Sequence, residues 1–137
     1  MTDLLSEEQR SLRMALIKSK NSKPEVRLRK LIYSLGYRYR LHVPELPGKP
    51  DIVFPGRKKV IFMHGCFWHR HSTQRCRLTR LPKSRLEYWR PKLEANHQRD
   101  IRNRRRLKGL GWQSLVIWEC EMANLEMISR RVAAFLE

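Results

Sequence analysis

The sequence predicts a single α/β domain in which a central mixed sheet is flanked by helices. Three observations lead to this prediction. The chain has 137 residues, enough for one hydrophobic core but not for two. Apolar runs typical of buried strands alternate along it with amphipathic stretches typical of helices. It contains no internal repeat, low-complexity segment or Pro/Gly/Ser-rich linker that would divide it further.

The N-terminal third is expected to form an arm, a helix and a strand. Residues 4–18 indicate a short helix or a partly ordered arm. The stretch NSKPEVRLRKLIYSLG predicts a helix that begins after Ser22 as N-cap and ends at Gly36. The next stretch, YRYRLHV, alternates apolar and basic residues, which is typical of a half-exposed strand.

The middle of the chain predicts a hairpin of two buried strands. The apolar runs DIVF and KKVIFM are joined by the tight turn PGR. Such a hairpin would bring Asp51 and residues 63–64 into one neighbourhood. Residues 64–83, which follow, indicate an irregular, Arg-rich loop.

The C-terminal part predicts two helices separated by a strand. The stretch KSRLEYWRPKLEANHQRDIRNRRRLKGLG indicates a helix with a break near Pro91 and an end at Gly109 or Gly111. The apolar run WQSLVIWEC predicts a central strand. The last stretch, NLEMISRRVAAFLE, predicts an amphipathic helix.

Charge indicates the class of partner. The chain has 30 Lys and Arg residues against 13 Asp and Glu, a net charge of +17. So basic a domain favours a polyanion, and nucleic acid is preferred to acidic lipid because the basic residues do not gather on one amphipathic helix. No apolar stretch of about 18 residues exists to span a membrane. The charged start predicts no export, and three cysteines, an odd number, fit a reducing cytoplasm.

The cysteines predict a metal site. Cys66, His71 and Cys76 have the spacing Cys-x4-His-x4-Cys, and Cys120 follows the last strand, where it could complete a tetrahedral set for structural Zn²⁺. A polar loop has little apolar surface to fold on, so a metal would supply its order. The alternative is that the thiols are small buried apolar groups, and His64 and His69 compete with His71 as the histidine ligand.

A second group of residues suggests hydrolysis of phosphodiester bonds. Asp51 opens a strand and could hold Mg²⁺, while His64 and His69 could transfer protons near neutral pH. Glu25 could reach the same pocket from the first helix. The alternatives are that Asp51 is a turn aspartate and that Glu25 forms a capping box with Ser22.

Four stretches resemble one known family. LPGKPDIVF, KKVIFMHGCFWHRH, KSRLEYWRPKLEANHQRD and LKGLGWQSLVIWEC are similar to the very short patch repair (Vsr) endonucleases of the PD-(D/E)xK, restriction-endonuclease-like superfamily. The resemblance covers about residues 11–125. It implies an N-terminal DNA-binding arm at residues 1–20 and an endonuclease domain at residues 21–137.

The resemblance also implies an activity. Such an enzyme nicks double-stranded DNA 5′ to the thymine of a T:G mismatch, with catalytic Mg²⁺ (two ions expected) and structural Zn²⁺. We expect a monomer in the bacterial cytoplasm, associated with the nucleoid, that hands its product to downstream repair proteins. The alternatives are a zinc-stabilised binder of distorted DNA without catalysis and a nickase of the same fold with a different target.

Site residues follow from the resemblance position by position. Asp51 stands at the Mg²⁺-binding aspartate, and Met63, a threonine in some members, where a main-chain carbonyl helps to hold the metal. His64 takes the place of the superfamily's usual lysine, and His69 that of a general base or acid. Glu25 is similar to a remote glutamate that contacts metal-bound water.

The remaining positions concern zinc and DNA. Cys66, His71, Cys76 and Cys120 resemble the zinc ligands, although family members place the third ligand nearer to the histidine, where this chain has Thr73. Apolar residues resemble those that enter the duplex beside the mismatch: Phe67, Trp68 and Trp89 from the major groove, and Met14 and Ile17 from the minor groove. The alternative is that the tryptophans belong to the core.

Overall fold

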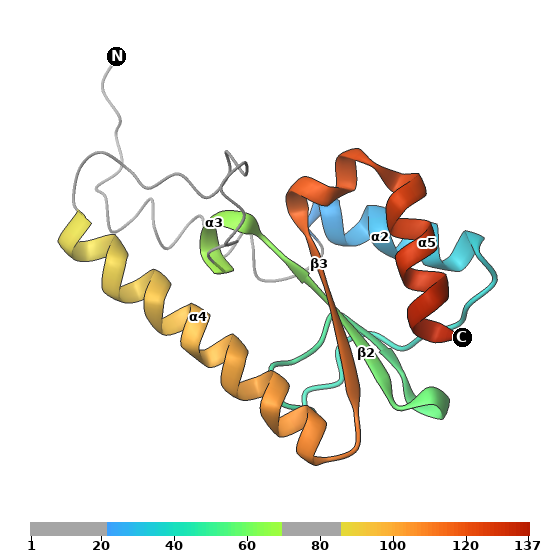
Figure 1. Ribbon diagram of the computed structural model, residues 1–137, viewed down its shortest axis with the longest axis horizontal. Helices are drawn as coiled ribbons and strands as arrows, with labels where there is room; N and C mark the ends of the chain where they lie inside the picture. Colours follow the sequence, from blue (N-terminus) through green and yellow to red (C-terminus); the bar gives the residue numbers. More distant parts are fainter. Residues whose placement is uncertain (1–21, 70–85) are drawn as a thin grey trace.

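A computed structural model describes residues 22–69 and 86–137 (Figure 1). The expected arm at residues 1–20 and most of the Arg-rich loop lie outside the described residues. The described elements are α2 (Lys23–Ser34), β1 (Ile52–Phe54), η1 (Pro55–Arg57), β2 (Lys59–His64), α3 (Cys66–His69), α4 (Leu86–Gly109), β3 (Gln113–Trp118), η3 (Glu119–Ala123) and α5 (Leu125–Leu136).

The described strands form one mixed sheet in the order β1-β2-β3. β1 pairs antiparallel with β2, Ile52 opposite Ile61, and β2 pairs parallel with β3, His64 opposite Trp118. The predicted hairpin and the mixed character of the sheet are therefore confirmed. The expectation that WQSLVIWEC is the central strand is wrong for the described strands, because β2 holds that position.

The alternating stretch YRYRLHV does not form the expected strand. It contributes one isolated bridge, between Arg40 and Val53. Beyond the bridge, His42 takes a φ of 56°, which turns the backbone out of the extended conformation. Period-2 alternation is a weak signal here, since the basic side chains of the stretch are satisfied on a loop as well as on a strand.

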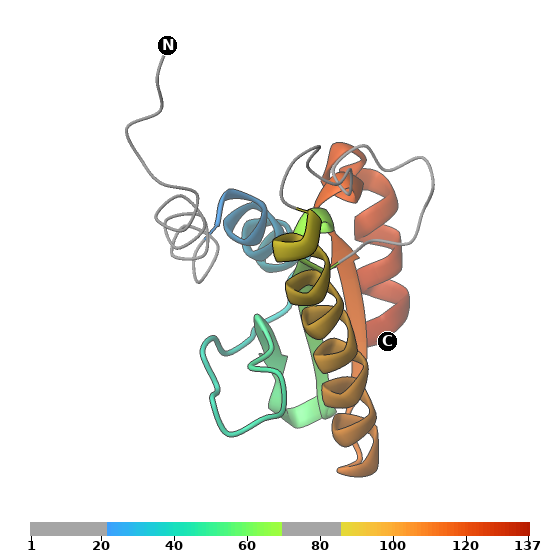
Figure 2. The ribbon, with the colours of Figure 1, turned by 90° about the vertical axis from the view of Figure 1, so that its left-hand side faces the viewer.

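Helices cover both faces of the sheet (Figures 1 and 2). On the face of α2 and α5, buried side chains from the strands, including Ile52, Ile61 and Ile117, pack with Leu28 and Ile128. On the opposite face, the intervening strand residues pack against α4. That second core consists of Val53, Val60, Phe62, Leu107 and Val116, with Trp112 and Trp118 against it. Adjacent residues of a strand thus serve opposite cores.

The predicted start and end of α2 are confirmed, whereas the predicted break inside α4 is wrong. Ser22 Oγ accepts from the backbone N–H of Glu25 at 3.4 Å, and Gly36 (φ 96°) follows the end of α2, as expected. The expected break at Pro91 does not occur, because α4 continues through it. Pro91 and the residue four before it, Glu87, are exposed, so water can satisfy the carbonyl that the proline leaves without an intrahelical donor.

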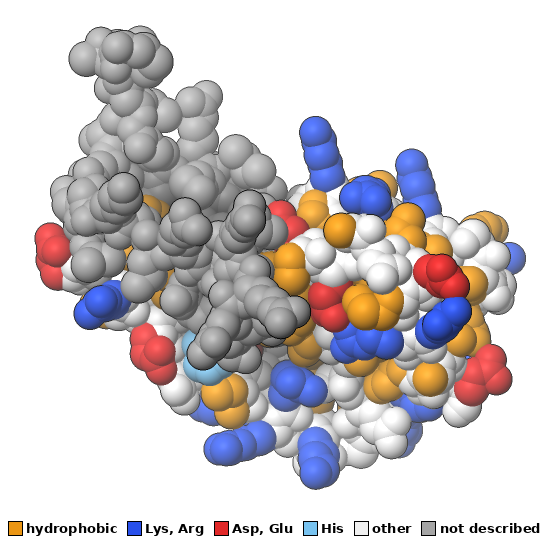
Figure 3. All heavy atoms as spheres, turned by 45° about the horizontal axis from the view of Figure 1, so that its top comes forward, with side chains coloured by type: hydrophobic (Ala, Val, Ile, Leu, Met, Phe, Trp, Pro, Cys, Tyr) orange, Lys and Arg blue, Asp and Glu red, His pale blue; other side chains and the backbone are white. Residues whose placement is uncertain are grey.

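Basic side chains are spread over the surface. Figure 3 shows Lys and Arg side chains scattered over the viewed face among apolar and acidic ones. Among the described helices, none has the length and apolar character needed to cross a bilayer.

Candidate active site where β1 begins and β2 ends

The antiparallel pairing of β1 and β2 brings Asp51 against the end of β2. The backbone N–H of Met63 donates to Asp51 Oδ2 at 2.6 Å. The hairpin therefore places Asp51 and residues 63–64 in one neighbourhood, as the sequence predicts. Because the bond uses a main-chain donor, the position of the carboxylate depends on strand register and not on the Met63 side chain.

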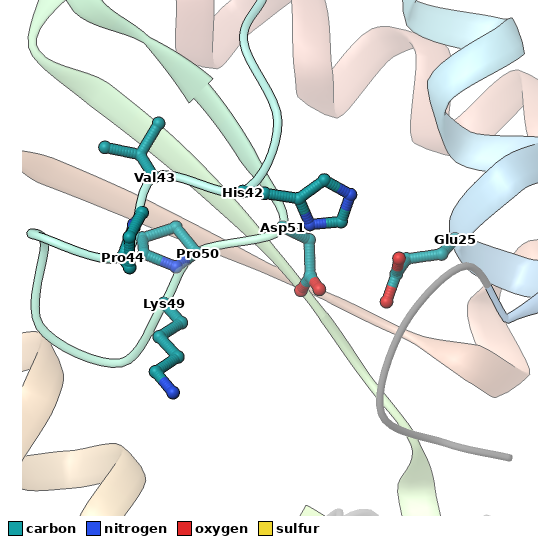
Figure 4. Close-up of a pocket in the computed structure, with 7 residues that line it drawn as sticks. All are labelled: Glu25, His42, Val43, Pro44, Lys49, Pro50 and Asp51. Carbon is teal, nitrogen blue, oxygen red and sulfur yellow. The ribbon is translucent and has the colours of Figure 1, made fainter. Parts of the chain in front are cut away.

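Glu25 brings a second carboxylate to the same place from the first turn of α2. It is 6% exposed, and Arg29, one turn later, donates to its Oε2 from Nη2 at 2.6 Å. Glu25 and Asp51 line one cavity of about 260 Å³, and Figure 4 shows their carboxylates facing each other. The capping reading of Glu25 is thus incomplete: its N–H is capped by Ser22, while its carboxylate points into the cavity.

The proximity of two acids changes their chemistry. Burial, and then the negative charge of Glu25, raise the pKa of Asp51 from 3.8 to about 8, although the Met63 N–H and Arg29 oppose the shift. A divalent cation between the carboxylates would remove this repulsion. Carboxylate oxygens are the ligands that Mg²⁺ prefers, so the donor set fits that ion.

A pair of stacked imidazoles lies beside the acids. His64 ends β2 on the α4 face, and its ring stacks on that of His69 from α3, with centroids 4.0 Å apart and planes 6° apart. Phe62 and Trp118 contact the His64 ring from neighbouring positions. Burial, and then the neighbouring His69, lower the pKa of His64 to about 3, so it is neutral at neutral pH.

Asp100, which the sequence reasoning missed, completes this group. Its Oδ2 lies 2.5 Å from His69 Nδ1, across 31 residues of chain. A signal for it was present, because Asp100 stands seven residues after Leu93 and seven before Leu107, both buried on the inner face of α4. An acid at the same heptad position must face inward as well.

The side chains of His64, His69 and Asp100 have ligand atoms within 4.8 Å of one another and could hold a metal ion. The geometry of the rings argues against a shared ion. Nitrogen lone pairs lie in the ring plane, and two nearly parallel planes do not aim their lone pairs at one point. A carboxylate on Nδ1 instead fixes the tautomer and orientation of His69, which suits proton transfer at Nε2.

The two halves of the site adjoin. A smaller cavity, of about 60 Å³, is lined by Glu25, Met63 and His69, and also by Glu119 of η3. A carboxylate pair fit for a cation and an imidazole oriented by an acid therefore lie next to each other. Together they can polarise a phosphate and handle the proton of an attacking water.

Other sequence-predicted residues are placed only in part. Cys66 is fully buried, and the backbone N–H of Cys120 donates to its Sγ at 3.4 Å, so these two cysteines lie together. Trp89 is half-buried in the first turns of α4, with its ring edge-on to Tyr88. The side chains of Phe67 and Trp68, and all of Met14, Ile17, His71 and Cys76, lie outside the described part of the chain.

Comparisons with known proteins identify the family of this chain. Residues 2–75 match the family model described as DNA mismatch endonuclease Vsr. The type II nicking enzyme V.XorIIP of Xanthomonas oryzae pv. oryzae is 50% identical over 137 residues, which cover 100% of this chain and 98% of that protein. DNA mismatch endonuclease Vsr of Escherichia coli is 38% identical over 94% of this chain and 81% of its own length.

Among solved structures, the catalytic domain of the homing endonuclease I-Bth0305I has a similar fold. The TM-score is 0.57 at 17% sequence identity, and the match covers 84% of this chain and 94% of that domain. At this identity the similarity concerns the fold alone. It is consistent with the expected mixed sheet between helices.

Proposed function

Since this chain belongs to the Vsr family and is a DNA-nicking endonuclease, we propose that it nicks one strand of a duplex 5′ to the thymine of a T:G mismatch. The main support for this activity is that Asp51 and Glu25 line one cavity and that this cavity lies beside the His69–Asp100 pair. Membership of the Vsr family supports the T:G mismatch as the target, and the geometry of the cavity supports hydrolysis of a phosphodiester bond.

In the proposed reaction, Asp51 and Glu25 would hold Mg²⁺, with the Met63 main-chain carbonyl as a further candidate ligand. The metal would neutralise charge that develops on the phosphate in the transition state. His69 accepts the proton of the attacking water at Nε2, because Nδ1 faces Asp100, and Asp100 stabilises the resulting charge. His64, neutral and stacked on His69, keeps that ring in place.

The mismatch preference is assigned to apolar side chains. Phe67, Trp68 and Trp89 would enter the duplex from the major groove, and Met14 and Ile17 from the minor groove. Unstacking a base pair costs roughly a few kcal/mol and costs least where pairing is already poor. A half-buried Trp89 in the first turns of α4 is accessible for this role.

We assign structural Zn²⁺ to Cys66, His71, Cys76 and Cys120. The closeness of Cys66 and Cys120 supports two of the four ligands. Because Cys66 begins α3 and His69 ends it, a metal held there would also fix the position of the proposed base.

The test uses end-labelled duplexes that differ only at one base pair. With Mg²⁺, the chain should cut the thymine strand of the T:G duplex at one position, leave the partner strand whole and leave a 5′-phosphate and a 3′-hydroxyl. Asp51→Ala should bind the duplex without cutting it. Activity of Asp51→Ala would contradict the metal assignment.

A second candidate target is a matched recognition sequence, since V.XorIIP, the 50% identical relative, is named a type II nicking enzyme. Equal cutting of T:G and matched duplexes of one sequence would favour that target over a mismatch. The catalytic assignments would be the same in both cases.

A further inference from the structure

The loop between α2 and β1 brings two cationic or hydrogen-bonding side chains to the proposed catalytic cavity. His42 and Lys49 line the same cavity as Glu25 and Asp51. Figure 4 shows His42 above the two carboxylates and Lys49 on another side of the cavity. Both residues are exposed, so both can reach a ligand from solvent.

Both residues also have a backbone conformation that side chains other than glycine seldom adopt. The φ angle is 56° at His42 and 48° at Lys49, in the left-handed region. Such conformations are found where surrounding structure imposes them, and they concentrate at ligand-binding sites. Among the described non-glycine residues, Lys58 is the remaining one with a positive φ, at 53°.

Contacts at three points impose the shape of this loop. At its start, Arg40 and Val53 exchange backbone hydrogen bonds of 2.8 and 2.9 Å. In its turn, the N–H of Lys49 donates to the carbonyl of Leu46 at 3.2 Å. Next to Lys49, Gly48 lies so close to α4 that an added Cβ would come 3.0 Å from Asn103 Cβ. The loop is thus held at its start, at its turn and against the neighbouring helix.

From this geometry we infer that His42 and Lys49 bind phosphate oxygens of the DNA strand that is cut. The acids of the cavity would hold a cation, and that cation would bind the reacting phosphate. The strand carries further anionic oxygens, and among the described residues that line this cavity the side chains with N–H donors are those of Lys49 and His42. Both are suited to phosphate. The inference rests on the proposed function in that the substrate is DNA.

The other interpretation is that the two side chains merely offset the charge of the acids. The interpretations differ in what they predict for DNA affinity without metal. A residue that contacts a phosphate contributes about 0.9 to the log–log dependence of affinity on salt, whereas a counterion for Asp51 and Glu25 contributes none.

Lys58→Ala is the matched control. It removes the same side chain and charge from the same left-handed conformation on the exposed surface. It lies at the opposite end of β2 from Met63, about 16 Å away along the strand. Any effect of net charge or of backbone strain should therefore be equal in the two variants.

The experiment measures binding of a labelled matched duplex in chelator over a range of salt concentrations. Lys49→Ala should weaken binding roughly tenfold and lower the magnitude of the salt slope by about 0.9, and Lys49→Arg should restore both. His42→Ala should weaken binding similarly, and His42→Asn, which tolerates the left-handed conformation and keeps a donor, should recover most of it. Far-ultraviolet circular dichroism checks that each variant is folded.

Equal slopes and affinities for Lys49→Ala and Lys58→Ala would overturn the inference. Because binding is measured on a matched duplex without metal, the result does not depend on mismatch nicking. If the wild type fails to nick T:G while Lys49→Ala shows the slope change, the phosphate contact stands and the proposed target is wrong.

Discussion

The imidazole rings of His64 and His69 lie face to face, with centroids 4.0 Å apart and planes 6° apart. The His64 ring is buried. His64 is 5% exposed, and burial, followed by the neighbouring His69, lowers its pKa from 6.5 to about 3. The stack therefore pairs a neutral ring with a ring that Asp100 orients.

The lowered pKa of His64 predicts a pH dependence of folding. Between about pH 3 and 6.5 the unfolded chain carries a proton on His64 that the folded chain lacks, so this group makes stability rise with pH in that window. His64→Gln should remove the contribution. The free energy of unfolding of His64→Gln minus that of wild type should fall by about 1.4 kcal/mol per pH unit between about pH 4 and 6. Urea unfolding in chelator measures it.

Asp51 predicts the opposite slope. Its pKa is raised to about 8, so between about pH 4 and 8 the folded chain holds a proton that the unfolded chain lacks, and stability falls as pH rises. For Asp51→Asn minus wild type, the free energy of unfolding should therefore rise with pH across that window. If the difference in the free energy of unfolding from wild type did not change with pH for either His64→Gln or Asp51→Asn, both pKa shifts would be contradicted.

The same shift predicts how Mg²⁺ acts. A cation must displace the proton of the Asp51–Glu25 pair, so the Mg²⁺ concentration for half-maximal nicking should fall about tenfold per pH unit below about pH 8 and level off above it. Titrations of nicking rate with Mg²⁺ at several pH values measure this. In Glu25→Gln, which lacks the charge that raises the Asp51 pKa, the levelling should begin at a lower pH. A half-maximal concentration that is independent of pH would contradict the assignment.

Asp100 predicts a loss of rate without a loss of binding. Asp100→Asn removes the charge beside His69 Nδ1, so single-turnover nicking should slow by roughly 100-fold or more while duplex affinity stays within about twofold. Glu94→Gln is the control, because it removes an acid from the exposed side of the same helix. Equal rates for the two variants would show that Asp100 does not assist the reaction.

The sequence predicts the parts of this site that local patterns determine. Two apolar runs around PGR predict the hairpin, and the hairpin predicts the closeness of Asp51 and Met63. The N-cap at Ser22 places Glu25 in the first turn of α2. None of these patterns gives the angle at which α2 meets the sheet, and that angle directs the carboxylate of Glu25 to Asp51.

Other features depend on packing over long distances. His69 and Asp100 meet because α4 lies along one face of the sheet. The heptad spacing of Asp100 indicates that it faces inward, but no local pattern shows that its partner is a histidine 31 residues away. The stretch YRYRLHV has strand periodicity, but strand formation also needs a neighbour with free hydrogen-bonding groups. In the described part of the sheet, this stretch pairs with Val53 through one isolated bridge.

We expect burial to determine how much each of two similar ion pairs contributes to the free energy of unfolding. Arg29–Glu25 and Arg130–Glu126 are both i,i+4 pairs with 2.6 Å contacts, but the side chains are 12% and 7% exposed in the first and 79% and 77% in the second. Arg29→Ala should lower the free energy of unfolding by about 3 kcal/mol, because it leaves a buried carboxylate without this donor. Arg130→Ala should change it by less than about 0.5 kcal/mol. Equal effects in chemical denaturation would show that Glu25 does not depend on Arg29.

The proposed zinc site predicts the metal content of the purified chain. If Cys66 and Cys120 are ligands, the chain purified without chelator should contain about one Zn²⁺ per molecule by elemental analysis, and Cys120→Ser should lose it. Loss of the metal should also destabilise α3, so nicking should fall even though Cys120 is not among the proposed catalytic groups. His71→Asn should behave like Cys120→Ser, whereas His97→Asn, which removes a histidine of α4, should keep its zinc. A metal-free wild type with full stability would leave the cysteines as buried apolar groups, and α3 would then be held by its packing on α4 together with the contacts of His69 with His64 and of Cys66 with Cys120.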